Sequence, residues 1–585
     1  MEDTSNGATT PNQPQKKKEL SMELRLLLAL VLMGGVMFTT PYFMRMVSPQ
    51  PPQQQAGKSA PAAAPATPSA PVQPPAQTPT VAAAKPQQPA AAPSAPVVAA
   101  EKEQYHFLET DLYQITFSNR GGVVTHWLLK EHKAANGKPL ELVNTAAKVP
   151  RPFAFYFKNQ KPSRDLNQAL YAMKPDADGL GVSFEFSDGN VKARKVFRFE
   201  KRRYLSKISA EVSEGGKQIP SWILWRGGFG DFAATGAAST GYVLHYDEAT
   251  GKLVKNGHKD AKDGPISASG RFLFAGIEDT YFAAVFLPGN GNMDVVAFSD
   301  STPTVVDQAE QLFAGTAVSE GTSNEIALFV GPKDVDILRA INPKLEQVVD
   351  FGWFGFLAKP LFLVVNWVTT HLIPNYGWAI IVVTVALNFL LFPLKITSMK
   401  SMKKMQALAP QIKAIGDKYK GISMRDPRKG EQNQEVMALY KKHGVNPMGG
   451  CVPMLLQIPF FFAFYKVFTV SVEMRGASWL WVADLSQPET LPIKILPIAM
   501  IVSQFVMQKM TPTAGVDPAQ QRMMLFMPLV FGFMFYYFSS GLVLYYLTSN
   551  VVGIAQQWFF NRTSTAEALA RSIEITAPKK KNGRK

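Results

Sequence analysis

The residues of this sequence that most indicate a function are polar side chains inside long apolar runs. The clearest is Asn388, which interrupts the apolar run of residues 376–394, just before a dense basic segment that begins at Lys395. At about 1.5 Å per helical residue, Asn388 would lie roughly 10 Å inside the hydrocarbon of a bilayer, on the side of the lysines. An amide at this depth either hydrogen-bonds a neighbouring helix or lines a cavity that holds water, and both interpretations stay open here.

The later apolar runs carry further neutral polar residues but no Asp or Glu. A proton relay or an ion-coupled pump usually needs a carboxylate within the bilayer, so both classes are disfavoured. Each polar residue alone is explained by helix association, whereas together they are consistent with a hydrophilic groove that accepts a polar segment without binding it tightly. The candidate groove-lining residues are Asn388, Thr384, Gln457, Ser503, Gln504, Ser549 and Asn550, and Gln556 and Gln557 belong to the same scattered set.

The region from residue 101 to about 330 gives no catalytic signal. It contains no G-x-x-x-x-G-K-[ST], G-x-G-x-x-G, H-E-x-x-H or G-x-S-x-G motif, and its histidines are scattered. The single cysteine of the chain, Cys451, excludes an intramolecular disulfide. We therefore expect a protein that is not an enzyme and that uses no cofactor, no metal and no small-molecule substrate.

The elements that must position the groove begin with a membrane anchor. The 585 residues carry a net charge of +16, and the basic residues cluster beside apolar runs, as positive-inside topology requires. Residues 1–25 form a polar tail that we place in the cytoplasm. The apolar segment 26–44 is longer than the usual core of a signal peptide, which favours an uncleaved signal anchor. Residues 45–100, rich in Pro and Ala, predict a disordered linker.

Alternating apolar residues then predict a large β-domain over residues 101–341. Tyr113, Ile115 and Phe117 are separated by polar residues, and the same period of two returns at residues 182–186. This period, bounded by turn residues, is typical of half-buried antiparallel strands. We expect one β-sandwich-like domain on the far side of the membrane from the N-terminus.

Charge decides which of the next two apolar stretches crosses the membrane. Residues 395–447 carry twelve Lys or Arg against four Asp or Glu, which places this segment in the cytoplasm. An odd number of crossings must therefore separate it from the β-domain. Lys359 and Pro360 would fall within the first stretch, where a central Lys costs about 3 kcal/mol. We expect residues 342–373 to form an amphipathic interfacial helix and residues 374–394 to cross.

The basic segment 395–447 predicts a helical hairpin in the cytoplasm. Apolar residues recur at spacings of three and four from Met399 to Tyr419, and a second helix follows around residues 431–442. The hairpin either rests on anionic lipid headgroups or uses its flexible methionines, Met402 and Met405 among them, to contact passing apolar segments. We weigh the two roles equally.

Four further crossings complete a chain with six spans. They are residues 448–470, 493–510, 523–538 and 541–560, joined by an outer loop at 471–492 and an inner loop at 511–522. Both termini then lie in the cytoplasm. The basic tail, residues 561–585, suits anionic lipid and, as a less favoured partner, ribosomal RNA. The short span at 523–538 is about 24 Å long, so local bilayer thinning is plausible there.

Several motifs, in one order along the chain, resemble the YidC membrane-protein insertase family of Gram-negative bacteria. They are Asn119-Arg120-Gly121-Gly122, Asn446-Pro447-Met448-Gly449-Gly450-Cys451 with Pro453, Gln457-Ile458-Pro459, Gln508-Lys509-Met510-Thr511-Pro512, and Gly541-Leu542-Val543-Leu544-Tyr545-Tyr546 with Ser549-Asn550. The likeness covers the anchor, the linker, the β-domain, the interfacial helix, a five-span core and the tail.

The resemblance implies a polytopic α-helical membrane protein with a β-supersandwich periplasmic domain and a hydrophilic groove in the inner leaflet. It implies insertion of nascent membrane proteins into the bacterial inner membrane, alone or beside the Sec translocon, without nucleotide hydrolysis. Candidate substrate contacts are Met402, Met405, Tyr545 and Tyr546. Asn388 matches the position where the family usually has an arginine, which predicts a wet groove without that positive charge. The alternatives are a solute transporter and a membrane scaffold or assembly factor that acts mainly through its β-domain.

Overall fold

The structure is a computed structural model, and it describes residues 96–234, 241–289, 291–303, 310–421, 426, 428–446, 452–510 and 518–563. The predicted N-terminal tail, the signal anchor and nearly all of the linker lie outside these residues. So do residues 511–517 of the inner loop predicted at 511–522, and residues 564–585 of the basic tail predicted at 561–585. Residues 405–446 belong to a compact unit separate from the one that holds the β-domain and the remaining helices.

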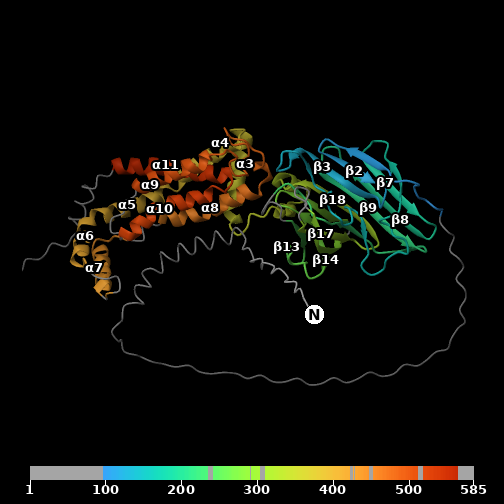
Figure 1. Cartoon of the computed structure of the whole chain (residues 1–585), viewed down its shortest axis with the longest axis horizontal. Coiled ribbons are helices and arrows are strands. Elements are labelled where there is room, and N and C mark those ends of the chain that lie inside the picture. Colours follow the sequence, from blue (N-terminus) through green and yellow to red (C-terminus); the bar gives the residue numbers. More distant parts are fainter. Residues whose placement is uncertain are drawn as a thin grey trace, which may run out of the picture. The chain divides into compact units, whose positions relative to one another are not determined.

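The β-domain is built of strands (Figure 1), of which the described residues contain eighteen. They are β1 (Tyr105–Glu109), β2 (Tyr113–Ser118), β3 (Val123–Lys133), β4 (Pro139–Glu141), β5 (Phe155–Tyr156), β6 (Ala172–Pro175), β7 (Gly181–Ser187), β8 (Val191–Phe199), β9 (Leu205–Glu214), β10 (Lys217–Gln218), β11 (Trp222–Trp225), β12 (Tyr242–Asp247), β13 (Lys252–Gly257), β14 (Ile266–Glu278), β15 (Phe282–Pro288), β16 (Asn292–Pro303), β17 (Glu310–Ser319) and β18 (Ser323–Pro332).

The strands pair in antiparallel fashion into two sheets. In the described parts of the domain, one sheet has four strands in the order β1-β2-β3-β4. The other has fourteen, with the main path β5-β11-β17-β16-β14-β15-β18-β9-β8-β7-β6. In β2, Tyr113, Ile115 and Phe117 are buried while Gln114 is exposed, as the period of two predicts. The ring centroid of Phe117 lies 5.8 Å from that of Phe184 on β7, so the two sheets pack face to face.

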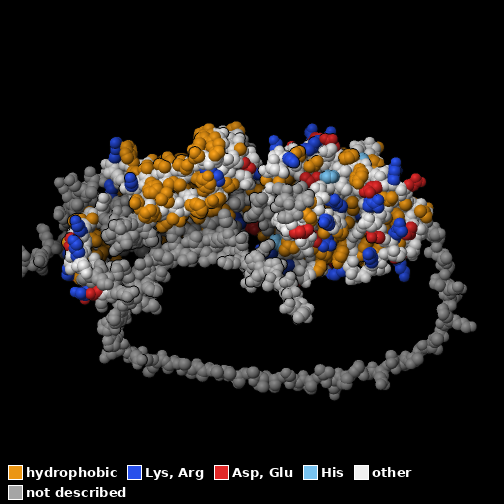
Figure 2. Space-filling view, in the orientation of Figure 1, with side chains coloured by type: hydrophobic (Ala, Val, Ile, Leu, Met, Phe, Trp, Pro, Cys, Tyr) orange, Lys and Arg blue, Asp and Glu red, His pale blue; other side chains and the backbone are white. Residues whose placement is uncertain are grey.

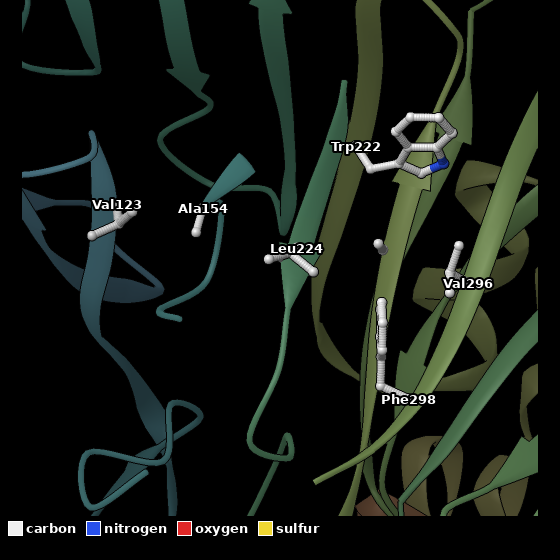
Figure 3. Close-up of a cluster of buried hydrophobic side chains, with 7 residues drawn as sticks. Val123, Ala154, Trp222, Leu224, Val296 and Phe298 are labelled. Carbon is white, nitrogen blue, oxygen red and sulfur yellow. The ribbon is translucent and has the colours of Figure 1, made fainter. Parts of the chain in front are cut away.

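Both sheets contribute to the apolar core of the domain. Figure 3 shows a buried cluster that runs from Val123 on β3 to the larger sheet. Burial of such side chains contributes about 25 cal/mol per Å² of apolar surface, and it must hold the domain together without a disulfide. The cluster consists of Val123, Ala154, Trp222, Leu224, Val296, Phe298 and Ala317.

A buried lysine fixes the turn of the Asn119-Arg120-Gly121-Gly122 motif. The ammonium of Lys195 donates hydrogen bonds to the carbonyl oxygens of Gly121, Gly122 and Phe153, at 2.7, 3.3 and 2.6 Å. Gly121 has a φ of +76°, and a Cβ there would lie 2.7 Å from the carbonyl oxygen of Asn167. Glycine is therefore required at this position for both backbone conformation and space.

Helices follow the β-domain. They are α2 (Val335–Ile341), the 3-10 helix η2 (Pro343–Val348), α3 (Gly355–His371), α4 (Tyr376–Leu390), α5 (Phe392–Ala407), α6 (Ala409–Lys418), α7 (Arg428–Lys442), α8 (Val452–Val470), the 3-10 helix η4 (Val472–Met474), α9 (Ile495–Met510), α10 (Pro518–Phe535) and α11 (Ser540–Thr563). In the larger unit, α11 packs on α4, α8 and α9, while α3 packs on α4 and α8.

The predicted span at 374–394 ends earlier than the sequence indicated. The helix α4 stops at Leu390, and α5 starts at Phe392 with its axis bent by 58°. Pro393 lies at the second position of α5, where a missing N–H is tolerated, and the residue before a proline disfavours a continuous helix. The last residues of the predicted span therefore begin the basic helix.

By length and hydropathy, none of the helices in the described ranges qualifies alone as a membrane span, whereas α4 and α5 qualify together as a bent pair. Large apolar side chains nevertheless remain exposed on the helices, and Figure 2 shows hydrophobic side chains gathered over them. On α3, Phe356 and Trp367 are exposed, while Phe362 and Val365 are buried. The helix expected at 342–373 is shorter than predicted, because α3 begins only at Gly355, after η2 and a non-helical stretch at 349–354; its place at a membrane interface stays a prediction.

The hairpin unit has a small core of its own. Leu408, Ile412, Tyr440 and Val445 are buried together. The predicted first helix of the hairpin is broken after Ala407, because Pro410 starts a new helix at α6. Part of the predicted connection, residues 422–425 and 427, lies outside the described residues.

Candidate functional site

The last turn of α4 places Asn388 against α11. Its amide nitrogen donates to the hydroxyl of Ser549 at 3.0 Å and to the carbonyl oxygen of Thr384 at 2.8 Å. Asn388 is only 3 % exposed. Two of the predicted groove residues, Asn388 and Ser549, are thus in direct contact across the helix pair, and Thr384 lies one turn before Asn388 on the same face.

A lysine completes this contact from the far side of the bend. The ammonium of Lys395, on α5, donates to the amide oxygen of Asn388 at 2.6 Å, and Lys395 is buried. Within the described part of the chain, no carboxylate pairs with Lys395. The cation that the Asn388 position was expected to lack is therefore supplied seven residues later. We define Lys395, Asn388, Ser549 and Gln556 as the polar node.

The role of Lys395 was not predicted from the sequence, because the lysines of the basic segment were assigned together to the cytoplasm. The spacing of seven residues carried no signal by itself, because Asn388 and Lys395 lie on two different helices that meet at a bend of 58°. Gln556, noted only as scattered polarity, also reaches this place: its side-chain nitrogen donates to the carbonyl oxygen of Asn388 at 3.2 Å. Tyr545, Ser549 and Gln556 share one face of α11, at spacings of four and seven.

The other predicted groove residues form two further contacts along α11. The amide nitrogen of Asn550 donates to the hydroxyl of Ser503 on α9 at 3.1 Å. Gln457 on α8 donates to the hydroxyl of Tyr545. The seven candidates therefore do not converge on one point; they follow the surfaces where α4, α8 and α9 meet α11, while Gln504 lies beside Ser503 on α9.

Several buried polar atoms along these surfaces have no hydrogen-bond partner among the residues that the structure describes. They are the hydroxyl of Thr384, the side-chain carbonyl of Gln504 and the side-chain carbonyl of Gln556. A buried polar atom without a partner costs about 1–3 kcal/mol, so such atoms mark places where water or a ligand completes the bonding. Within the described residues, Thr384 and Gln556, which both hydrogen-bond to Asn388, thus keep spare hydrogen-bonding capacity, whereas Gln504 lies on α9.

The four predicted substrate contacts face other side chains of the protein. Met402 is buried, and Met405 packs against the core of the hairpin unit. The ring of Tyr545 is fully buried and stacks on Phe464, with centroids 4.1 Å apart. The ring of Tyr546 lies 5.0 Å from that of Phe535. Met405 and Tyr546 are half-buried, whereas a substrate could contact Met402 or Tyr545 only if their neighbours moved. The roles of all four stay predictions.

Metal chemistry finds no support in the side chains that the structure describes. No group of three or more His, Cys, Asp or Glu residues lies close enough there to hold a metal ion. The polar node contains one ammonium, two amides and one hydroxyl, and the structure shows no nucleophile paired with a general base in it. Its groups donate and accept hydrogen bonds, and Lys395 adds a positive charge.

Comparison with known families covers most of the chain. Residues 367–567 match the family described as 60Kd inner membrane protein, and residues 107–364 match the YidC periplasmic domain. The chain is 34 % identical over 568 residues to the membrane protein insertase YidC of Syntrophus aciditrophicus, covering 92 % of this chain and 100 % of that protein.

Two further relatives extend the comparison. The membrane protein insertase YidC of Cupriavidus necator is 35 % identical over 498 residues, which is 81 % of this chain and 85 % of that protein. Among solved structures, the crystal structure of an active YidC insertase with its first transmembrane domain resolved is 19 % identical, with a TM-score of 0.35, and the match covers 79 % of this chain and 93 % of that one.

Proposed function

Because the chain belongs to the YidC family of membrane protein insertases, an inner-membrane family with a periplasmic domain, we propose that it inserts nascent membrane proteins and helps them to fold, alone or beside the Sec translocon. The relatives are named as insertases, which favours a role without catalysis of a covalent reaction. The groove, the topology and the partners below belong to this proposal.

The proposed topology has six spans with both termini in the cytoplasm. Exposed apolar side chains on α4, α9 and α10 support contact with lipid, because a soluble protein rarely exposes a continuous apolar surface of this kind. Examples are Val382, Phe389, Val502, Val530 and Phe533. Two observations favour this arrangement: the matching family is described as an inner membrane protein, and residues 395–447 carry a net positive charge.

The observation that carries the proposed mechanism is the polar node at the cytoplasmic end of α4. A cation, two amides and a hydroxyl lie together on helices whose outward surfaces are apolar. Polar groups of this kind are expensive in a bilayer and are kept where they bind something or line water. We infer that the node is the inner part of a hydrophilic groove open to the cytoplasm.

Such a groove lowers the barrier for the hydrophilic part of a substrate. A nascent apolar segment gains about 25 cal/mol per Å² on leaving water, so its own entry into lipid is downhill. The obstacle is the polar flank that must cross first. Water and hydrogen-bonding groups that reach partway into the bilayer shorten the apolar distance for this flank. No nucleotide hydrolysis is then needed.

Lys395 gives the proposed groove a preference among substrates. Its ammonium is held by the amide oxygen of Asn388 and, in the described residues, lacks an anionic partner. A carboxylate in the flank of a substrate would supply one. Beyond nascent membrane proteins and the Sec translocon, we propose anionic lipid and, through the basic tail, the ribosome as partners.

Reconstitution in liposomes tests the proposed function. The purified chain is combined with a short single-span substrate, and insertion is scored as protection from external protease. We expect Asn388→Leu to reduce insertion of a substrate with a charged periplasmic flank more than that of one with an uncharged flank. Val382→Leu, at an exposed apolar position of the same helix, is the matched control and should leave both unchanged. Equal loss for both substrates with Asn388→Leu would refute the groove.

A further inference from the structure

The carboxylate of Asp231 is held in a turn of the β-domain, where it can pair with a cation. Asp231 follows a glycine-rich turn after β11, in which Gly228 and Gly230 have φ values of +94° and +101°. Its two carboxylate oxygens accept hydrogen bonds from the backbone N–H groups of Ala135 and Ala233, at 2.8 and 2.9 Å. The side chain of Asp231 is only 1 % exposed. A buried carboxylate is costly unless a cation neutralises it.

A second carboxylate, that of Asp279, holds the backbone of this turn by hydrogen bonds. Asp279 accepts hydrogen bonds from the N–H groups of Asp231, Tyr281 and Phe282, at 2.9, 2.8 and 2.6 Å. Burial raises the pKa of Asp279 to about 6, against the lowering effect of these hydrogen bonds. Asp279 therefore fixes the backbone of the turn, and with it the position of the buried Asp231 carboxylate.

The cation for Asp231 comes from a distant part of the chain. Arg475, in the loop between α8 and α9, forms an ion pair with Asp231 and donates to the carbonyl oxygen of Lys133 at 2.9 Å. Its guanidinium lies over the rings of Tyr281 and Phe282, 5.1 and 5.4 Å from their centroids. Only 10 % of the Arg475 side chain is exposed. The contact thus combines charge, a backbone hydrogen bond and two cation–π interactions.

The same loop is fastened to the helices on its other side. The Asn375 side chain, at the start of α4, donates to the carbonyl oxygen of Ser478 at 3.0 Å. The N–H groups of Ser540 and Gly541, at the start of α11, donate to the carbonyl oxygens of Gln487 and Leu485, at 2.8 and 2.9 Å. The loop is therefore bound to two helices of the core as well as to the β-domain.

We propose that Arg475 and Asp231 form an intramolecular docking site through which the loop at 471–487 holds the β-domain at a fixed orientation on the helical core. The partner surface consists of Asp231, the carbonyl of Lys133 and the rings of Tyr281 and Phe282. This inference goes beyond the proposed function, because it concerns how the periplasmic domain is fixed and not how a substrate is inserted.

Distance measurement between spin labels tests the docking site. In a Cys451→Ser background, Lys252→Cys on the β-domain and Leu372→Cys after α3 offer two exposed positions for labels. We expect one narrow distance distribution for the parent. Arg475→Ala should at least double the width of this distribution, because the β-domain then rotates against the core.

A matched substitution and a milder variant complete the test. Arg194→Ala removes an exposed ion pair with Glu185 on the β-domain and should leave the width unchanged. Asp231→Asn keeps oxygen and size but removes the charge, so it should broaden the distribution to an intermediate extent. A width for Arg475→Ala equal to that of the parent would overturn the proposal. Should Arg475→Ala fail to fold, an unchanged width for Asp231→Asn would overturn it instead, and neither result depends on insertion activity.

Discussion

Replacing Lys395 with methionine tests whether the positive charge of the proposed groove matters, independently of its packing. Methionine keeps the length and most of the apolar volume of the lysine stem, so Lys395→Met removes the ammonium with little change in packing. The amide oxygen of Asn388 retains the hydroxyl of Ser549 at 3.4 Å as a hydrogen-bond donor. The polar node therefore loses its charge without leaving this oxygen unpartnered.

From the structure we expect Lys395→Met to affect the stability of the protein and its insertion activity in opposite directions. Lys395 is 9 % exposed and has no anion beside it in the described residues, so the desolvated cation costs free energy of folding. Lys395→Met should thus leave the stability unchanged or raise it. A substrate carboxylate near the ammonium, by contrast, would gain about 1.5–3 kcal/mol from a charge-assisted hydrogen bond. Its loss corresponds to a slowing of insertion by about tenfold or more.

The assay compares three substrates that differ only in the flank that crosses the bilayer. Protease protection in liposomes is followed over time for acidic, neutral and basic flanks, and the thermal stability of each variant is measured in detergent. The acidic flank alone should be slowed by Lys395→Met. Lys400→Met, at an exposed position of the same helix, is the control and should change nothing. Equal slowing of all three substrates, or none of any, would refute the role assigned to the Lys395 charge.

Two further predictions concern the stability of the periplasmic side. Lys195→Met leaves three buried carbonyl oxygens without their donor, so we expect the free energy of unfolding of the β-domain to fall by about 3–5 kcal/mol. Denaturant titration measures this loss, with the exposed Lys192→Met as the control. A loss below about 1 kcal/mol would contradict the prediction. Burial, with Asp334 and Asp336 nearby, raises the pKa of Glu473 to about 8. The folded state then keeps a proton that the unfolded chain releases above about pH 4.5, so stability falls as the pH rises from about 5 to 8. Glu473→Gln should flatten this decline in melting temperature, and an unchanged pH profile would show that Glu473 is not its source.

Local patterns in the sequence predicted where strands and helices form better than which of these elements pair or pack with one another. The alternation of Tyr113, Ile115 and Phe117 predicted a strand because its period is a property of neighbouring residues. The sheet order could not be predicted in the same way. The edge strand β5, for example, pairs with β11, more than sixty residues later, and such pairing depends on the packing of the whole domain.

The candidate site shows the same division between local and distant information. Asn388 was identified because an amide in an apolar run is unusual, and the structure places its side chain in contact with that of Ser549. The role of both residues in a groove stays a prediction. The proximity of Lys395 depends on the bend after Leu390, which a hydropathy pattern does not contain. The pair of Arg475 and Asp231 joins positions 244 residues apart, without any motif at either end.

Water at the polar node is the central claim, and cysteine labelling tests it most directly. In a Cys451→Ser background, Ser549→Cys is a small change beside Asn388, and Val551→Cys, at an exposed apolar position of α11, serves as the lipid-facing control. A thiol reagent that cannot cross membranes reacts only with a hydrated thiol. Added from the cytoplasmic side, it should label Ser549→Cys much faster than Val551→Cys. Equal, negligible labelling of both variants would contradict a water-filled site at Asn388.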